Sequence, residues 1–402
     1  MLDLLDSVEF LAMKPFADGM ARIRNEDAMT VFREAQALED KGKSILHFEI
    51  GQPDFPTPAH IKKAGIEAIE NNHTRYTVTE GLPEFIKAVQ AEIETTRGFT
   101  PDRQQILTLP GAKPGIYLSV ISTVNPGDEI IFPDPGFSTY GSLCSFTGAI
   151  PKPVRLKEEN LFRMNPTDIE AKISPKTKLI ILNSPNNPTG GVMTKAELEH
   201  VAEIAEKHDC YILSDEIYSK LVYGVDFFSA TIPDQARERS ILLDGFSKSY
   251  SMTGWRLGYL IGPKPLIHKM TTLVVNALTC TSGFIQMAGI AALTGPQDGL
   301  MQMRKAFLER RDIIVKGLNE IPGFTCLLPE GAFYAWANIT GTGLSSNELS
   351  QYLLHEAGVA CLPGTSFGSG GEGYLRFSYA TPIDIILEAI TRIKQAIERM
   401  EK

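Results

Sequence analysis

One lysine stands among small and hydroxyl residues in GFSKSYSMTGWRLG, residues 245–258. Lys248 follows an apolar run, and Arg256 comes eight positions later. A lysine that is partly desolvated and close to a fixed positive charge loses its proton more easily and becomes a nucleophilic amine. Arg256 could supply that charge and could also bind a phosphate group. The alternatives are a solvated loop lysine, which is the common case, and an arginine in an ordinary ion pair.

Other polar groups also follow apolar runs. Asp215 ends such a run and either caps a helix over EIYSKLVY or acts as a carboxylate that keeps a heterocyclic cofactor nitrogen protonated. The turn TLPGAKPG, which contains Gly111, offers backbone N–H groups at a helix start, where phosphate binds well. Taken alone, an ordinary tight turn explains it better. NSPNNPTG places Asn186 and Asn187 at another strand end, and an amide both donates and accepts hydrogen bonds.

These polar groups need a scaffold that brings them together. Short, continuously apolar runs are typical of strands buried on both faces of a sheet, and helical patterns alternate with them. One of these helices, TKAELEHVAEIAEKHD, opens with a capping box formed by Thr194 and Glu197. The alternation predicts a largely parallel sheet covered by helices, in which ligands bind beyond the carboxyl ends of the strands. The predicted strands are SILHFEI, QQILTL, DEIIFP, TKLIILN, CYILSDE and RSILLDGF.

The two ends of the chain do not follow this alternation of strands and helices. A helix over AMTVFREAQALEDKG is expected to end at Gly42, and GQPDFPTP must be an extended loop because each proline restricts the residue before it. After about residue 290 the pattern changes to a long charged helix, LMQMRKAFLERRDIIVKGLNEI. Short strands and a final helix follow, which predicts a second, α+β domain.

The composition limits the classes of function. The 402 residues include 39 Lys or Arg and 48 Asp or Glu, a net charge of −9, and no basic run offers a nucleic-acid footprint. The longest apolar runs are too short to span a membrane. Acidic residues interrupt the N-terminal leucines, so we expect no signal peptide. The five cysteines are scattered, which predicts reduced thiols in a cytoplasmic protein, and the histidines show no metal-ligand spacing.

The lysine loop resembles the lysine signature of the class I/II aminotransferases, the aspartate aminotransferase-like pyridoxal-phosphate enzymes of fold type I. The similarity covers nearly the whole chain, and its motifs come in family order: GQPDFPTP, RYTVTEG, GAKPG, PDPGFSTY, NSPNNPTG, SDEIYSKLVY, the lysine loop, GAFYAW and YLRFSYA. The resemblance implies an α/β fold, with a mostly parallel sheet flanked by helices in a large domain and a smaller α+β domain. We expect an N-terminal segment over residues 1–52 that joins the small domain, a large cofactor-binding domain over 53–290 and a small C-terminal domain over 291–402.

The resemblance also implies a site for pyridoxal 5'-phosphate. Lys248 would form a Schiff base with it and then carry a proton between the substrate α-carbon and the cofactor. Asp215 would pair with the pyridine nitrogen, while Tyr218 and Asn187 would hydrogen-bond the phenolic oxygen. Phe137 would stack on the ring. The phosphate would be held by residues from three segments, of which the last belongs to the other subunit of a homodimer: Gly111, Ala112 and Lys113, then Arg256, and Tyr76.

A substrate site follows from the same resemblance. Arg376 would clamp the substrate α-carboxylate, helped by Asn187 and by the backbone of Gly51. Because YLRFSY alternates as a strand, an exposed strand arginine is the alternative for Arg376.

One position departs from the family motifs, and one stretch matches the spacing of an unrelated motif. Many relatives carry a phosphate-binding serine where this chain has Gly245, and either Ser247 or Ser249 could take over that contact. GSGGEG, residues 368–373, satisfies the spacing GxGxxG, but it precedes a strand and opens no helix, so the dinucleotide mechanism is unavailable to it. We expect a flexible loop there.

The expected function is transfer of an amino group from an L-amino acid to a 2-oxo acid in amino-acid metabolism, with 2-oxoglutarate as acceptor. The same motifs serve carbon–sulfur β-lyases and other pyridoxal-phosphate enzymes of this fold, including cyclopropane-forming synthases. A non-catalytic regulator is a remote alternative, because such relatives usually carry an added N-terminal DNA-binding domain, for which the family match leaves no room. Some relatives use a lysine in the place of Lys113 to bind a distal carboxylate, but others carry it there with different substrates. Acidic, aromatic and small aliphatic donors therefore all stay open.

Overall fold

The computed structural model describes residues 16–23, 27–234 and 238–400. The expectation that the chain has no signal peptide falls almost entirely on residues 1–15, which lie outside the described residues. Within the described part, no helix combines the length and the apolar character needed to span a membrane.

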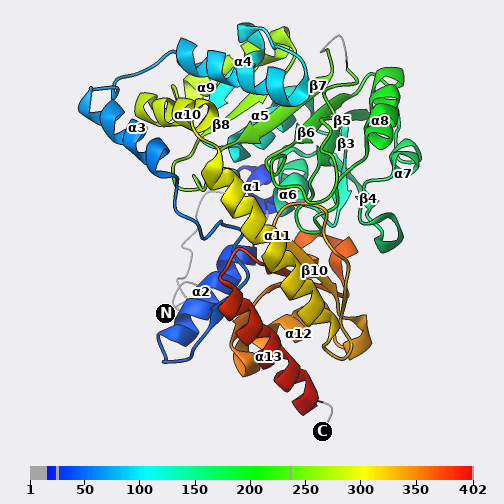
Figure 1. Cartoon of the computed structure of the whole chain (residues 1–402). Coiled ribbons are helices and arrows are strands. Elements are labelled where there is room, and N and C mark those ends of the chain that lie inside the picture. The colour runs from blue at the N-terminus through cyan, green and yellow to red at the C-terminus, as the bar shows by residue number, and fades with distance from the viewer. Residues whose placement is uncertain (1–15, 24–26, 235–237, 401–402) are drawn as a thin grey trace.

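A seven-stranded sheet forms the larger part of the molecule (Figure 1). Strand β8 runs antiparallel to both of its neighbours, β2 and β7, and the other neighbouring strands are parallel. The prediction of a mostly parallel α/β sheet is confirmed. In spatial order the strands are β2 (Ile106–Leu109), β8 (Gly258–Ile261), β7 (Ser240–Gly245), β6 (Tyr211–Asp215), β5 (Thr177–Asn183), β3 (Glu129–Asp134) and β4 (Ile150–Arg155).

The central strands are apolar throughout because helices bury both of their faces. In β5, Leu179 and Ile181 pack into one apolar cluster, while Ile180 and Leu182 pack into another on the opposite face. The first cluster includes residues of α5 (Lys113–Thr123), α6 (Ser138–Thr147) and α9 (Lys264–Ala277). The opposite face packs against α8 (Lys195–Lys207) and, nearer β2, against α3 (Ala59–Glu70), α4 (Pro83–Arg97) and α10 (Gly283–Thr294). The capping box of Thr194 and Glu197 at the start of α8 is present as predicted.

The C-terminal part of the chain builds a second apolar core below this sheet in Figure 1. It contains an antiparallel sheet in the order β12 (Leu362–Pro363), β13 (Tyr374–Ser378), β10 (Tyr334–Asn338) and β9 (Thr325–Cys326). Its helices are α11 (Asp298–Asn319), α12 (Ser346–Tyr352) and α13 (Ile383–Met400). The N-terminal segment joins it through β1 (Leu46–His47), which pairs in parallel with β11 (Val359–Ala360). In its described part, this segment also contains the helices α1 (Asp18–Arg22) and α2 (Asp27–Glu39). The boundaries proposed at residues 52 and 290 stay predictions.

Three strands differ from the sequence prediction. SILHFEI contains only the two-residue strand β1, because the Phe48 backbone bonds to both Ala360 and Ser378, and the carbonyls beyond it accept side-chain donors. Strand β4 was not predicted because Pro151 and Pro153 interrupt its sequence, which a strand tolerates at the edge of a sheet. Strand β8 was also missed, since its four residues follow directly on the lysine loop.

The loop GSGGEG opens no helix of the dinucleotide-binding kind, as expected. It contains one 3-10 turn, Ser369–Gly371, and leads directly into β13. It is also more firmly held than we predicted. The Ser369 hydroxyl and the Gly370 N–H both donate to the Asp134 carboxylate, at 3.0 and 2.8 Å.

Candidate active site

A cavity of about 490 Å³ opens beyond the carboxyl ends of β5, β6 and β7, where the sequence placed the site. Residues of the C-terminal core close its other side, among them Tyr334 of β10 and Arg376 of β13. Ten of the predicted site residues line it: Gly51, Ala112, Lys113, Phe137, Asn187, Asp215, Tyr218, Lys248, Arg256 and Arg376.

Lys248 lies in the loop that follows β7 and reaches into this cavity. Its Nζ donates a hydrogen bond of 2.6 Å to the carbonyl oxygen of Gly51. Burial lowers the pKa of Lys248 to about 8, and the positive charges of Arg376 and Lys113 act in the same direction. Near pH 8, about half of this side chain is therefore a neutral, nucleophilic amine.

Arg376 is buried, and only 4% of its surface is exposed. Nη1 donates to Asn187 Oδ1 at 3.2 Å, and Nη2 donates to the carbonyl oxygen of Glu49. The guanidinium also lies over the Tyr334 ring, 4.5 Å from its centroid. Nε is buried and has no hydrogen-bond partner among the described residues. The alternative of an exposed strand arginine is therefore wrong.

Asp215 is the last residue of β6, and 5% of its surface is exposed. Oδ2 accepts a hydrogen bond of 2.7 Å from the Tyr140 hydroxyl, and Oδ1 accepts one from the backbone N–H of Ile217. Burial raises the pKa of Asp215 to about 6, although the Tyr140 hydrogen bond opposes this rise. Residues 217–220 form turns, so Asp215 caps no helix over EIYSKLVY. A buried carboxylate with such a pKa is stabilised by any cation that enters the cavity.

Tyr218 and Tyr334 meet across the cavity from the two parts of the molecule. Their hydroxyl oxygens lie 2.8 Å apart, and burial raises the pKa of Tyr218 well above its usual value, so both keep their protons. The approach is so close that a Cβ on Gly51 would lie 2.2 Å from the Tyr334 hydroxyl oxygen. Glycine is therefore required at position 51, which leaves its carbonyl beside Lys248.

The other end of the cavity combines a helix start with an arginine. Helix α5 begins at Lys113, directly after Gly111 and Ala112. Gly111 has a φ of +92°, and a Cβ there would lie 2.3 Å from Nη2 of Arg256, so the guanidinium lies against the glycine backbone. The N–H groups at a helix N-terminus, together with a guanidinium, favour a phosphate group.

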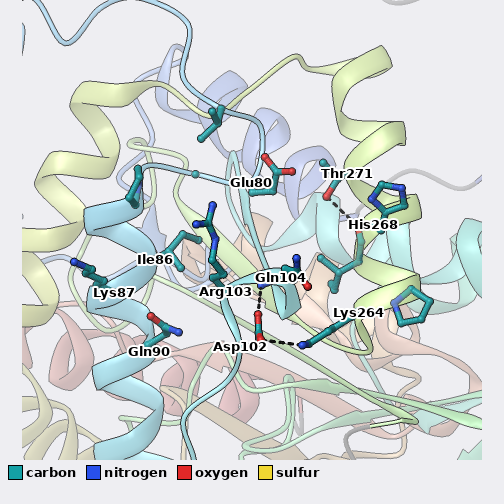
Figure 2. Close-up of a pocket in the computed structure, with 15 residues that line it drawn as sticks. Glu80, Ile86, Lys87, Gln90, Asp102, Arg103, Gln104, Lys264, His268 and Thr271 are labelled. Atoms are coloured by element: carbon teal, nitrogen blue, oxygen red, sulfur yellow. Dashed lines mark hydrogen bonds and ion pairs between the residues drawn. The ribbon is translucent and has the colours of Figure 1, made fainter.

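Two features lie away from this cavity. Tyr76 is 87% exposed and is not among the described residues that line it. A larger cavity of about 920 Å³ lies between α4 and α9, with Lys87, Arg103, Lys264 and His268 at its wall (Figure 2). None of the described residues predicted for the site lines that cavity.

Comparison with known proteins identifies the family. Residues 43–393 match the family model described as aminotransferase class I and II. An aspartate aminotransferase of Pyrococcus horikoshii is 39% identical over 95% of this chain and 97% of the relative. The crystal structure of an aspartate aminotransferase from Rhizobium meliloti superposes with a TM-score of 0.92 at 33% identity, covering 96% of this chain and all of that one. An alanine aminotransferase from Pyrococcus furiosus gives 0.91 at 32% identity, over 96% and 100% of the two chains.

The chain belongs to the class I and II aminotransferases. It is therefore an aminotransferase that depends on pyridoxal phosphate and acts on amino-acid and 2-oxo-acid substrates, and the β-lyase and regulator alternatives are set aside. The chain is also similar to an aromatic-amino-acid aminotransferase of Thermococcus litoralis, with 37% identity over 96% of this chain and 97% of the relative.

The residues of this aminotransferase fit pyridoxal phosphate. The Gly111 backbone and Arg256 leave a cradle that a side chain at position 111 would fill. The buried Nε of Arg376 finds no partner among the described residues and can still donate to a carboxylate. Lys248 and Asp215 supply an amine and a buried carboxylate within the same cavity. These are the groups that an anionic aldehyde with a ring nitrogen requires.

Sequence reasoning gave no role to three residues of the site. Tyr140 donates to Asp215, Tyr334 contacts Tyr218, and Asn183 joins two strand ends by donating to the Asp215 carbonyl oxygen at 3.1 Å and accepting from the Asn187 N–H at 2.8 Å. Tyr140 and Tyr334 stood inside the quoted motifs PDPGFSTY and GAFYAW, which was the available signal. Their partners lie far away in the sequence, so spacing alone could not assign them.

Proposed function

We propose that this aminotransferase uses Lys248 as its catalytic amine, takes its amino group from an acidic L-amino acid and passes it to 2-oxoglutarate. The observation that carries this proposal is the position of Lys248, whose Nζ lies in the cavity at the carbonyl of Gly51. The Asp215 carboxylate and the Arg376 guanidinium line the same cavity.

Each of these side chains has a separate role in the proposed reaction. Lys248 Nζ would hold the aldehyde carbon of pyridoxal phosphate. Once free, it would move the proton from the substrate α-carbon to that carbon in the first half of the reaction, and from that carbon to the α-carbon of the 2-oxo acid in the second half. Asp215 holds a proton on the ring nitrogen, and Tyr140 keeps that carboxylate in place. Bound pyridoxal phosphate supplies the electron sink that makes the α-proton acidic. Phe137 packs beside the ring, while Tyr218 and Asn187 bind the phenolic oxygen.

The phosphate is bound by the backbone of Gly111, Ala112 and Lys113 together with Arg256. Ser247 lines the cavity and Ser249 is not among the described residues that do, so we assign to Ser247 the contact that Gly245 cannot make. The Ser249 hydroxyl is buried and has no hydrogen-bond partner within the described chain.

The substrate α-carboxylate is bound by Arg376, Asn187 and the backbone around Gly51. The proposed acidic donor is supported by Lys113, which adds another cation to the cavity wall. Further support comes from relatives of Pyrococcus abyssi and Geobacillus stearothermophilus that are named aspartate aminotransferases.

We also propose a homodimer in the cytoplasm. Tyr76 is exposed and lies outside its own cavity, which supports a role for its hydroxyl at the phosphate of the other subunit. All five cysteines are free, as expected of a reducing compartment. Light scattering should give twice the chain mass of 44.2 kDa, and a monomer with full activity would contradict the dimer.

The test is the absorbance of the purified holoenzyme mixed with single L-amino acids in the absence of any oxo acid. Conversion of the cofactor band to that of the amine form by L-aspartate and L-glutamate supports the proposal. Conversion only by aromatic amino acids or alanine rejects the acidic donor but keeps the reaction. Release of ammonia without this conversion, or no cofactor band after pyridoxal phosphate is added, rejects the mechanism.

A further inference from the structure

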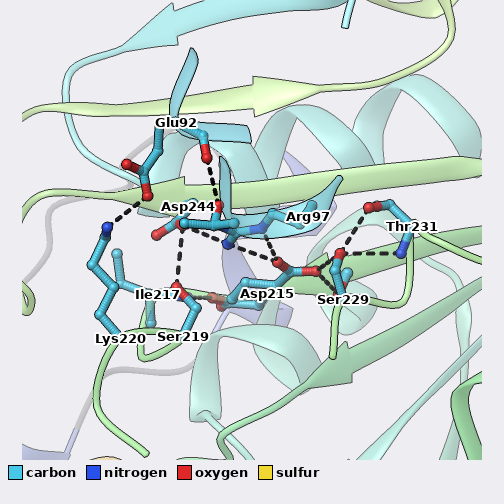
Figure 3. A network of polar contacts seen from close by, with 12 residues as sticks. Glu92, Arg97, Asp215, Ile217, Ser219, Lys220, Ser229, Thr231 and Asp244 are labelled. Carbon is cyan, nitrogen blue, oxygen red and sulfur yellow. Dashed lines mark hydrogen bonds and ion pairs between the residues drawn. The ribbon is translucent and has the colours of Figure 1, made fainter. Parts of the chain in front are cut away.

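Helix α4 carries an ion network that lies behind the cavity, outside its lining. Arg97, the last residue of α4, places its guanidinium between Glu216 and Asp244. Nη2 lies 2.9 Å from Glu216 Oε2 and 2.9 Å from Asp244 Oδ2, and Nε lies 3.1 Å from Glu216 Oε2. Figure 3 shows Arg97 reaching the carboxylate of Asp244 between the strands. We call Arg97, Glu216 and Asp244, with their serine partners, the Arg97 network.

The carboxylates of the Arg97 network belong to the segments that carry the site residues. Glu216 directly follows Asp215, and Asp244 stands four residues before Lys248. Asp244 Oδ1 accepts a hydrogen bond of 2.7 Å from the N–H of Gly245, at the start of the lysine loop. Asp244 Oδ2 also accepts one of 3.3 Å from Ser219, the residue after Tyr218. One guanidinium is thus linked to two segments, the turn after β6 and the start of the lysine loop, whose neighbouring residues line the cavity.

Further hydrogen bonds restrain the turn that follows β6. Glu216 Oε1 accepts hydrogen bonds from the Ser214 and Ser229 hydroxyls, at 2.8 and 2.5 Å. At the other end of the turn, Lys220 donates to Glu92 of the same helix α4 at 2.5 Å. Helix α4 therefore holds both ends of the turn that presents Tyr218 to the cavity.

Stability alone does not account for this arrangement. Arg97, Glu216 and Asp244 are 5%, 1% and 4% exposed, so all three charges have lost most of their hydration. Buried ion pairs contribute little net stability compared with apolar residues of the same size. One guanidinium also faces two carboxylates, which leaves a negative charge in the interior. A well-packed apolar contact would serve the fold at least as well.

We propose that Arg97 is a positioning residue, which acts through Glu216 and Asp244 to fix the spacing of Asp215, Tyr218 and Lys248. This inference rests on the roles given to those three residues under the proposed function. A misplacement of about 1 Å at reacting groups can reduce a rate by about 10²-fold. A planar guanidinium with several fixed donors holds two carboxylates in one geometry, which a single ammonium group does not reproduce.

The experiment compares the holoenzymes of Arg97→Lys and of the control Arg163→Lys with the wild type. Arg163 also pairs with a carboxylate, Glu330, at 3.0 Å, but neither residue lines the cavity. We measure kcat, KM, the melting temperature and the visible circular dichroism of the bound cofactor. For Arg97→Lys we expect kcat to fall about tenfold or more and the dichroism band to change, with KM within about twofold because Arg376 and Asn187 are intact. Arg163→Lys should change neither kcat nor the band.

A lower melting temperature for Arg97→Lys with wild-type kcat and dichroism would show that the network is only structural and would overturn the inference. If that variant does not fold, the isosteric Glu216→Gln decides, and an unchanged kcat and band would again overturn it. These outcomes require an active wild type. An inactive wild type, or one without a cofactor band, would instead reject the proposed function.

Discussion

The cavity and the Arg97 network lie on opposite sides of the same strand ends, and they treat charge in opposite ways. In the network, the Arg97 guanidinium pairs with two carboxylates, and serine hydroxyls complete their hydrogen bonds. In the cavity, Lys248, Arg256 and Arg376 donate to carbonyl and amide oxygens.

A buried cation that lacks a carboxylate is costly unless an anion joins it. The network pairs its cation with carboxylates of the chain, whereas the buried Arg376 donates only to amide and carbonyl oxygens of the described residues. We propose that this difference separates the charges that hold the protein in shape from those that bind the cofactor phosphate and the substrate carboxylate.

The largest effect is expected from Lys248→Ala. Removal of the only proposed group that both holds the cofactor and moves the α-proton should reduce kcat by about 10³-fold or more. Steady-state assays with a saturating donor and acceptor measure it. Lys264→Ala is the matched control, because Lys264 forms an exposed ion pair with Asp102 and does not line the cavity. Full activity in Lys248→Ala would contradict the mechanism.

The substitution Arg376→Lys tests the proposed contact with the substrate α-carboxylate in the cavity. Loss of a two-point contact with the α-carboxylate should lower kcat/KM about 10²-fold, mostly through KM, because an ammonium group does not replace a planar guanidinium. The absorbance of the bound cofactor should not change. Kinetics over a range of donor concentrations separate KM from kcat, and an unchanged KM would remove Arg376 from the substrate site.

The pKa of Lys248 predicts a pH dependence for cofactor capture by the apoenzyme. Burial and neighbouring cations lower the pKa to about 8, so the reactive neutral amine increases with pH up to that value. Well below pH 8 the capture rate should rise about tenfold per pH unit, and above it the rate should level off. Stopped-flow absorbance at several pH values measures this. A midpoint near the usual lysine pKa would mean that the cavity does not perturb Lys248.

The smallest effect is expected at His47, whose single ring pairs with the buried carboxylate of Glu49. His47 Nδ1 lies 2.8 Å from Glu49 Oε1, and this hydrogen bond raises the pKa of His47 to about 9. The raised pKa contributes stability that is complete below the unfolded value near 6.5 and is lost as the pH rises through about 9. His47→Gln should therefore lower the melting temperature by about 2 °C at pH 6 and by less above pH 9. An equal change at both pH values would contradict this linkage.

Much of the fold could be predicted because its central strands are apolar on both faces and are followed by polar residues. Lys248, Asp215 and Asn187 were found in this way, since parallel strand ends meet at one edge. The roles of Tyr140, Tyr334 and Arg97 could not be predicted. Each depends on a partner far away in the sequence, and only the packed structure brings the two together. In the sequence, Arg97 looks like an ordinary basic residue at the end of a helix. Only the folded structure shows that it pairs with Glu216 and Asp244.

The pairing of β1 with β11 has a consequence for how the protein is made. Leu46 lies beside Val359 in the finished sheet, so about three quarters of the 402-residue chain must be synthesised between the two strands. At about 5–20 residues per second, this takes roughly 15 to 60 s. During that time, the apolar stretch that contains Ile45, Leu46 and Phe48 has no partner strand, although all three side chains end up buried. The β1 segment therefore reaches its final hydrogen-bonding position only after residues 359–360 have been synthesised.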